Sequence, residues 1–156
     1  MLTEYISEFA KYKKLGEQTI AQLSEEALNF VPSAEANSIA MIVRHLHGNL
    51  CSRFTDFLTT DGEKPSRNRT EEFALTTYSH ADVERYWQGG WEQLESALAA
   101  LSDEDLRRVV TIKGKSVTAD GAICRALAHV AYHIGQIVLL GRTGRGVDWG
   151  YLSTPR

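Results

Sequence analysis

Two histidines one helical turn apart are the residues best suited to chemistry in this sequence. His129 and His133 lie in the segment AHVAYHIGQ, so in a helix their imidazoles stand on one face. Two imidazoles at this spacing can share a metal ion with bonds of about 2.0–2.2 Å. Gln136, one turn further on, could orient a ligand or a bound water. The alternative is a pair of partly buried, hydrogen-bonded histidines, because the glutamate of the H-E-x-x-H motif is missing.

A third imidazole is available in the segment RHLHGN, where either His45 or His47 could reach the metal from a facing helix. Three protein ligands leave coordination positions open, which is typical of catalytic rather than structural sites. His47 falls on the apolar side of its helix with Leu50 and Phe54. The residues alone leave the choice between the two histidines open.

Four helices are expected to position these residues, because apolar side chains recur at threes and fours in four segments. The expected helices span about 2–28, 38–58, 80–101 and 118–140. Asn37 or Ser38 is the expected N-cap of the second helix, and Gly141 the expected C-cap of the fourth. The Gly89-Gly90 pair marks either a kink or a close helix contact in the third.

The connections between these segments predict an all-α four-helix bundle with a crossover. The segment of about 59–77 is long for a compact domain, and such a loop is often functional or a crossover. It would let the second and third helices run the same way as neighbours. Residues 108–118 alternate in polarity around Lys113-Gly114, which predicts a small hairpin before the fourth helix. A length of 156 residues predicts one domain over 1–156.

Composition favours a globular cytoplasmic protein. The net charge is −3 and no run of five basic residues occurs, which argues against a nucleic-acid partner. Cys51 and Cys124 lie in apolar segments without a C-x-x-C motif, so we expect buried thiols in a reducing compartment. The N-terminal stretch shows no signal-peptide pattern, and no segment reaches 18 apolar residues, so we expect no membrane partner.

Several separated stretches resemble the DinB-like superfamily. NSIAMIVRHLHGN at 37–49 resembles its second-helix signature, and AHVAYHIGQIVLLGR at 128–142 resembles its fourth-helix signature, where H-x-x-x-H-x-x-Q is typical. RNRTEEF at 67–73 and the ending DWGYLSTPR resemble one branch of uncharacterised bacterial members. The resemblance covers nearly the whole chain and implies an up-down-down-up four-helix bundle.

The same resemblance implies a function. Carried over by motif, the metal ligands would be His45, His129 and His133, usually holding zinc or nickel, in a protein that is often a homodimer. The superfamily includes thiol transferases that use bacillithiol, mycothiol or glutathione, and a metal-dependent isomerase. We therefore expect a metal-dependent enzyme that transfers a low-molecular-weight thiol to an electrophilic small molecule. The reacting group would be a metal-bound water or thiol. The alternatives are a metal-dependent hydrolase and a non-catalytic, stress-related metal-binding bundle.

Further polar residues are candidates for orienting the ligands or binding the substrate. This set consists of Gln136, Asn49, Arg53, Arg67 and Arg69. The carboxylates of a small thiol could be held by Arg53, by a basic pair in the crossover, or by Lys113 and Lys115 of the hairpin. For the crossover residues Arg67, Asn68, Arg69 and Glu72, two interpretations stay open. They are either a solvated loop, or anchors and anion-binding groups near the site.

Overall fold

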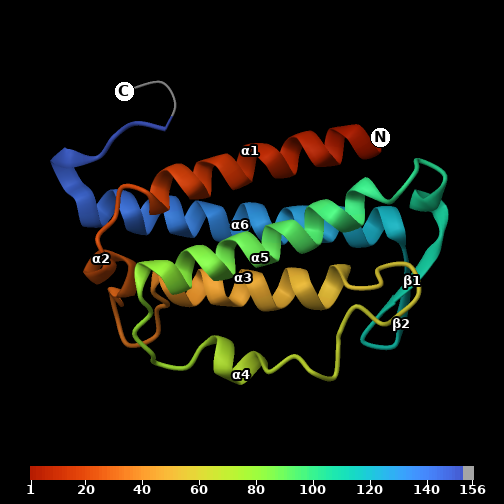
Figure 1. The fold of residues 1–156 in the computed structure, drawn as a ribbon, viewed down its shortest axis with the longest axis horizontal. Coiled ribbons are helices and arrows are strands. Elements are labelled where there is room, and N and C mark those ends of the chain that lie inside the picture. Colours follow the sequence, from red (N-terminus) through yellow and green to blue (C-terminus); the bar gives the residue numbers. More distant parts are fainter. Residues whose placement is uncertain (153–156) are drawn as a thin grey trace.

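The computed structural model describes residues 1–152, so the last four residues of the ending DWGYLSTPR lie outside it. Six α-helices, two short 3-10 helices and one hairpin occur in this range (Figure 1). The elements are α1 Leu2–Ile20, α2 Glu25–Asn29, α3 Ile39–Phe54, α4 Arg69–Glu72, α5 His80–Ala99, η1 Asp105–Arg107, β1 Val109–Ile112, β2 Lys115–Thr118, α6 Ala119–Arg145 and η2 Gly146–Asp148.

Four long helices form the bundle, in the predicted up-down-down-up order. In Figure 1, α3 and α5 run in one direction, while α1 and α6 run in the opposite direction. The chain between α3 and α5 returns along the outside of the bundle and carries the short helix α4 (Figure 1). The predicted crossover and the predicted hairpin before the last helix are therefore both confirmed.

Hydroxyl side chains set where the helices begin. The side chains of Ser38, Ser79 and Thr118 accept hydrogen bonds from the first turns of α3, α5 and α6. The first helix is shorter than expected, because α1 ends at Ile20. Ser24 then caps a separate short helix, α2, by accepting a hydrogen bond from the Ala27 backbone at 3.2 Å. Local capping thus divides a segment that apolar periodicity reads as continuous.

The last helix is longer than expected, and the prediction that Gly141 ends it is wrong. Gly141 is helical and buried, and a Cβ atom at this position would lie 2.6 Å from Cγ2 of Thr19 on α1. This glycine therefore permits a close contact between α1 and α6. The helix ends instead at Arg145, and its C-cap is Gly146, whose φ of 55° suits a residue without a Cβ.

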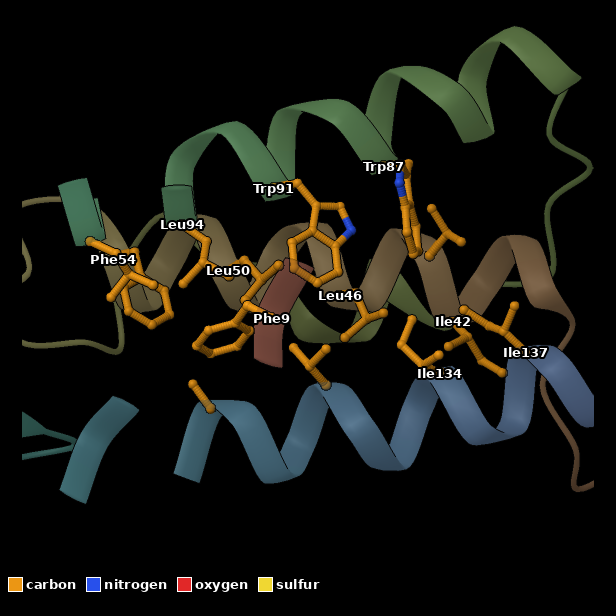
Figure 2. Close-up of a cluster of buried hydrophobic side chains, with 14 of the residues drawn as sticks. Phe9, Ile42, Leu46, Leu50, Phe54, Trp87, Trp91, Leu94, Ile134 and Ile137 are labelled. Atoms are coloured by element: carbon orange, nitrogen blue, oxygen red, sulfur yellow. The ribbon is translucent and has the colours of Figure 1, made fainter. Parts of the chain in front are cut away.

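The core lies along the apolar face of α3, between α5 and α6. Figure 2 shows Ile42, Leu46, Leu50 and Phe54 following one another along α3, with tryptophans of α5 on one side and isoleucines of α6 on the other. All of the labelled side chains in that figure are at most 5% exposed. Burial of these large apolar groups is the main source of stability for such a bundle.

Close packing, and not a kink, explains the glycine pair in α5. A Cβ atom on Gly90 would lie 3.0 Å from the Cα atom of His47, so α3 and α5 approach each other backbone to backbone here.

By its length and composition alone, α6 could cross a membrane, but the core helices of bundles pass the same test. In this structure α6 packs against α1 and α3, with both His133 and Ile134 buried.

The hairpin closes one end of the bundle and is tied to the crossover. Lys113 and Gly114 have φ values of 52° and 72°, which are the positive values that a two-residue type I′ turn requires. The backbone N–H of Lys113 donates a hydrogen bond to Oδ1 of Asp61 at 2.9 Å, and that of Gly114 donates to Oδ2 at 2.8 Å. Gly62 N–H also donates to the carbonyl of Thr111 at 2.8 Å. These contacts fix the hairpin beside the residues that follow α3.

Candidate metal centre

The imidazoles of His45, His129 and His133 meet between α3 and α6. Nε2 of His129 lies 3.1 Å from Nε2 of His45 and 3.2 Å from Nε2 of His133. One ring nitrogen from each residue lies within 4.8 Å of the other two. His45 and His133 are buried, and His129 is partly buried. The helical spacing of the pair on α6 therefore places both rings toward the same imidazole of α3.

The outer nitrogens of two of these rings are fixed by hydrogen bonds. Nδ1 of His45 lies 2.8 Å from Oε2 of Glu72, and Nδ1 of His133 lies 2.8 Å from Oε1 of Gln136. Because both partners are acceptors, each ring carries its proton on Nδ1 and turns the lone pair of Nε2 toward the centre. Nδ1 of His129 is buried and has no hydrogen-bond partner among the described residues.

This arrangement fits a bound cation. Nε2 of His129 can donate a hydrogen bond to one neighbouring nitrogen at most, so at least one of the two short contacts between ring nitrogens has no proton in it. A cation at the centre would stabilise the lone pairs that point there. Two nitrogens that bind one zinc ion at a tetrahedral angle, with bonds of about 2.0–2.1 Å, lie about 3.3–3.4 Å apart. The two nitrogen separations here are close to that value.

Burial keeps the two histidines of α6 neutral. It lowers the pKa of His129 to about 3, with added repulsion from the other two histidines and from Arg67 and Arg53. Burial likewise lowers the pKa of His133 to about 4, although the hydrogen bond to Gln136 opposes the change. A neutral imidazole is the form that binds a metal ion, so both rings are in the ligating form at neutral pH.

Glu72 connects the histidine cluster to the crossover. Its side chain is 1% exposed and accepts two hydrogen bonds from Arg67, from Nε at 2.8 Å and from Nη2 at 2.9 Å. Burial alone would raise the pKa of Glu72, but the hydrogen bonds from His45 and Arg67 outweigh it and lower the pKa to about 2. Glu72 is therefore ionised, and it orients His45 as carboxylates commonly orient metal-binding histidines.

One side of the cluster opens into a pocket of about 180 Å³ between α3, α6 and the hairpin. His45 and His129 are among its lining residues. The pocket is lined further by Asn49, Arg53, Glu63, Arg67, Arg69, Ile112, Lys113, Ala122, Arg125 and Ala126. This volume is below the roughly 300–1,000 Å³ of pockets that hold drug-sized ligands, so only a small molecule fits beside the histidines.

Most of the candidate residues from the sequence lie at the histidine cluster or its pocket, but His47 does not. Gln136 contacts a cluster histidine, and Asn49, Arg53, Arg67 and Arg69 line the pocket. His47 points elsewhere: its Nδ1 lies 3.1 Å from the carbonyl of Tyr86, and its ring packs on that tyrosine. The structure thus brings His45 and not His47 to the pair on α6.

Sequence reasoning placed some residues of this site only loosely and missed others. Glu72 and Arg67 anchor the crossover, as one of the two interpretations of this segment predicted. The contact of Glu72 with His45 was not predicted. Glu63 and Arg125 line the pocket without having been singled out. Arg125 lies one helical turn before His129, and this spacing is the one signal that could have found it.

Neither cysteine belongs to the cluster. Cys51 is partly buried with Sγ 3.8 Å from Nδ1 of His47, and burial raises the pKa of its thiol, so it is not poised as a thiolate. Cys124 is exposed on α6, which corrects the expectation that both thiols are buried.

The fold and the site define a helical bundle with a buried cluster of three histidines beside a polar pocket. A family model described as a protein of unknown function, DUF1572, matches residues 1–156, and the chain belongs to this family. Comparison with curated proteins finds no match. The family description names no reaction, so the argument for a function depends on the geometry of the site.

Proposed function

We propose that this protein is a metal-dependent enzyme of the DinB-like superfamily that transfers a low-molecular-weight thiol to an electrophilic substrate. The observation that carries the proposal is the convergence of three imidazoles on one centre beside a polar pocket. Three protein ligands leave room for a reacting group, as in catalytic metal sites. The metal proposed is zinc or nickel, and its supply in the cell would decide between them.

The residues of the chain would each have a defined part. His45, His129 and His133 would hold the metal ion, which when bound lowers the pKa of a thiol or water at its open position. Glu72 and Gln136 keep two of the rings in the ligating tautomer. The buried helices around the cluster exclude water from its inner side, which strengthens electrostatic interactions there.

In the proposed reaction, the sulfur of the thiol forms a bond to an electrophilic carbon. With an alkyl halide the carbon–halogen bond breaks, the halide leaves and the thiol proton passes to solvent. With an epoxide a carbon–oxygen bond breaks, and that oxygen takes up a proton. Thiol chemistry as opposed to another reaction is supported by the resemblance of the two histidine motifs to superfamily members with this activity. Fold-level likeness alone would not choose a reaction.

A hydrolase is the second candidate, and Glu63 favours it. Its carboxylate lines the same pocket as His45 and His129, and Oε2 of Glu63 is buried without a hydrogen bond among the described residues. A general base for water needs such a carboxylate. However, this oxygen also lies 3.2 Å from Nη2 of Arg53, so the carboxylate is already engaged in an ion pair and is not free to approach a water molecule. We therefore rank hydrolysis second.

The test is an activity screen on zinc-loaded and nickel-loaded protein. Glutathione, bacillithiol and mycothiol would each be offered with an aryl halide and with an epoxide, and thioether formation would be followed by mass spectrometry. We expect one thiol to be used by the wild type and by His47→Ala, and no turnover in His129→Ala. Turnover retained in His129→Ala, or release of hydrolysis products alone, would contradict thiol transfer.

The proposal also covers the cellular location, the partners and the oligomeric state of the protein. The substrate would be a small molecule in the cytoplasm, with no nucleic acid or membrane as partner, and the protein would act as a homodimer. Light scattering during size-exclusion chromatography would test the last point, with a mass near twice 17.4 kDa expected. A mass near 17.4 kDa at all concentrations would contradict it.

A further inference from the structure

The pocket beside the histidines carries a surplus of positive charge. Five cationic side chains line it and one carboxylate, Glu63, faces them. The cations are Arg53, Arg67, Arg69, Lys113 and Arg125. Clefts with charges of one sign and apolar walls concentrate counter-ions of the opposite sign. The whole chain carries a net charge of −3, so the positive pocket is a local feature and not a reflection of overall composition.

These cations differ in how fully they are already paired. Arg67 is engaged by both oxygens of Glu72, and Arg53 pairs with Glu63 at 3.2 Å. Nη1 of Arg67 and Nζ of Lys113 lie 3.5 and 4.0 Å from the same Glu63 carboxylate, so this one carboxylate is shared among three cations. The side chain of Arg125 lines the pocket without a hydrogen bond or ion pair to another of the described residues. Part of the positive charge in the pocket is therefore uncompensated.

The charge of Arg53 shows the same imbalance. Its side chain is 15% exposed, and burial lowers the pKa of its guanidinium; the pairing with Glu63 opposes this change, while repulsion from Arg67 and Arg125 adds to it. An anion placed among these groups would relieve that repulsion. It would also gain charge-assisted hydrogen bonds from guanidinium groups, which bind carboxylates and phosphates in a forked geometry.

Position along the helices gives the distance between this charge and the histidines. Arg53 follows His45 by eight residues on α3, which is about 12 Å along the helix axis, and Arg125 precedes His129 by four residues on α6, which is about 6 Å. Ala122 and Ala126, which have small side chains, also line the pocket. A short chain of atoms can therefore run from the histidines to the guanidinium groups.

We infer that this pocket binds the acidic group of the thiol or of its acceptor, with Arg53, Arg125 and Lys113 as the anion-binding residues. The inference rests on the proposed function in one respect, namely that the other end of the ligand reaches the metal site. The chemistry recognised is a carboxylate or a phosphate separated from the reacting atom by a chain of about six carbons, long enough to cover the roughly 6 Å that separate the positions of Arg125 and His129 along α6.

The experiment compares probes that differ only in charge or only in the thiol. Calorimetry on zinc-loaded protein would measure the affinities of 6-mercaptohexanoate, its neutral counterpart 6-mercaptohexanol, and the thiol-free hexanoate and hexyl phosphate. We expect 6-mercaptohexanoate to bind about tenfold tighter than 6-mercaptohexanol, because a charge-assisted hydrogen bond replaces a neutral one. The ratio of the affinities for hexanoate and hexyl phosphate would show which acidic group the pocket prefers.

Matched variants assign the effect to the pocket. Arg125→Gln should remove most of the preference for 6-mercaptohexanoate while zinc content and the affinity for 6-mercaptohexanol stay unchanged. Lys115→Gln removes the same charge from the hairpin at an exposed position outside the pocket, and should preserve the preference. Arg125 is itself exposed on α6, so its variant is expected to fold.

The outcomes separate this inference from the proposed function. Equal binding of the two mercapto probes, both tighter than hexanoate, would overturn the anion site and leave the thiol site standing. Equal binding of 6-mercaptohexanoate and hexanoate, lost for both in Arg125→Gln, would support the anion site and contradict thiol binding. A preference for the charged probe that persists in Arg125→Gln and falls in Lys115→Gln would also overturn the inference.

Discussion

Oε2 of Glu72 lies 2.8 Å from Nδ1 of His45, and through this contact the crossover between α3 and α5 reaches the histidine cluster. Arg67 holds the same carboxylate with two hydrogen bonds, so a segment without long helices is fixed at the site. The long connection is therefore part of the candidate metal centre. Its buried carboxylate sets both the tautomer and the orientation of His45.

Glu72→Gln is expected to weaken zinc binding. A glutamine can still accept a hydrogen bond from His45, but it is uncharged and orients and polarises the ring less well. Loss of such a carboxylate typically lowers metal affinity by roughly 10–100-fold, and we expect a value near the lower end because the acceptor remains. Competition titration with a chromophoric chelator would measure the change.

The same variant should also unfold more easily, because it leaves the buried Arg67 without its principal partner. Removing one member of a buried ion pair costs about 3 kcal/mol or more in the free energy of unfolding. Glu71→Gln is the control, since Glu71 is exposed and its side chain makes no hydrogen bond among the described residues. Equal zinc affinities in all three proteins would show that Glu72 does not position His45.

The metal-free protein should lose stability as the pH falls below about 6.5. The pKa values of His129 and His133 are lowered to about 3 and about 4 in the folded state, so between these values and 6.5 the unfolded chain binds more protons. Stability therefore rises with pH across this window, and each histidine should cost up to about 2 kcal/mol at pH 5 relative to pH 8. Glu72, with its pKa of about 2, adds a further loss only below about pH 4.5.

Urea unfolding of chelator-treated protein between pH 5 and pH 8 would measure this dependence. In a variant with both His129→Gln and His133→Gln, the stability difference between pH 8 and pH 5 should shrink, because glutamine does not titrate. An equal pH dependence in wild type and variant would mean that these histidines do not carry it.

Gly16→Ala should destabilise the bundle where α1 meets α5. A Cβ atom at this position would lie 2.1 Å from Cη2 of Trp87, an aromatic ring that is 5% exposed and cannot easily move. Overpacking of this kind costs about 1–3 kcal/mol. Thermal or urea unfolding would measure the loss.

Gly135→Ala is the matched control, because Gly135 lies on α6 with nothing within 4 Å of an added Cβ atom. There the higher helix propensity of alanine should stabilise the protein by up to about 1 kcal/mol. Opposite signs for the two variants are the expected result. A destabilisation of equal size in both would contradict the described packing of α1.

Removal of the metal should lower the melting temperature but leave the bundle folded. The apolar core includes buried residues of all four long helices and none of the three histidines, so we expect it to hold the fold without a ligand. A ligand that binds only the native state raises its stability in proportion to the logarithm of its concentration over its dissociation constant. Chelator-treated protein should therefore keep its helical circular dichroism spectrum and melt earlier than zinc-loaded protein. A coil spectrum without metal would indicate a purely structural site.

Local patterns in the sequence were enough to predict much of the bundle. The apolar periodicity located the four long helices, and Lys113-Gly114 located the hairpin turn, because both signals depend on neighbouring residues. The end of α1 at Ile20 and the helical state of Gly141 were not predictable in this way. They depend on capping by Ser24 and on the contact of Gly141 with Thr19 on another helix.

The candidate site was likewise predictable only where it depends on residues close together in the sequence. His129 and His133 share a helix, so their spacing placed both imidazoles on one face. The residues alone could not choose between His45 and His47, because that choice depends on how α3 is rotated against α6. The contact between Glu72 and His45 joins residues 27 positions apart through an irregular segment, and no periodic pattern encodes such a contact.

Metal content measured by elemental analysis on untagged protein tests the central claim most directly. The wild type would be compared with His45→Ala, His47→Ala and His133→Ala after incubation with zinc or nickel and removal of the excess. We predict about one metal ion per chain in the wild type and in His47→Ala, and its loss in His45→Ala and His133→Ala. A wild type without metal, or loss in His47→Ala with retention in His45→Ala, would contradict the tri-histidine centre.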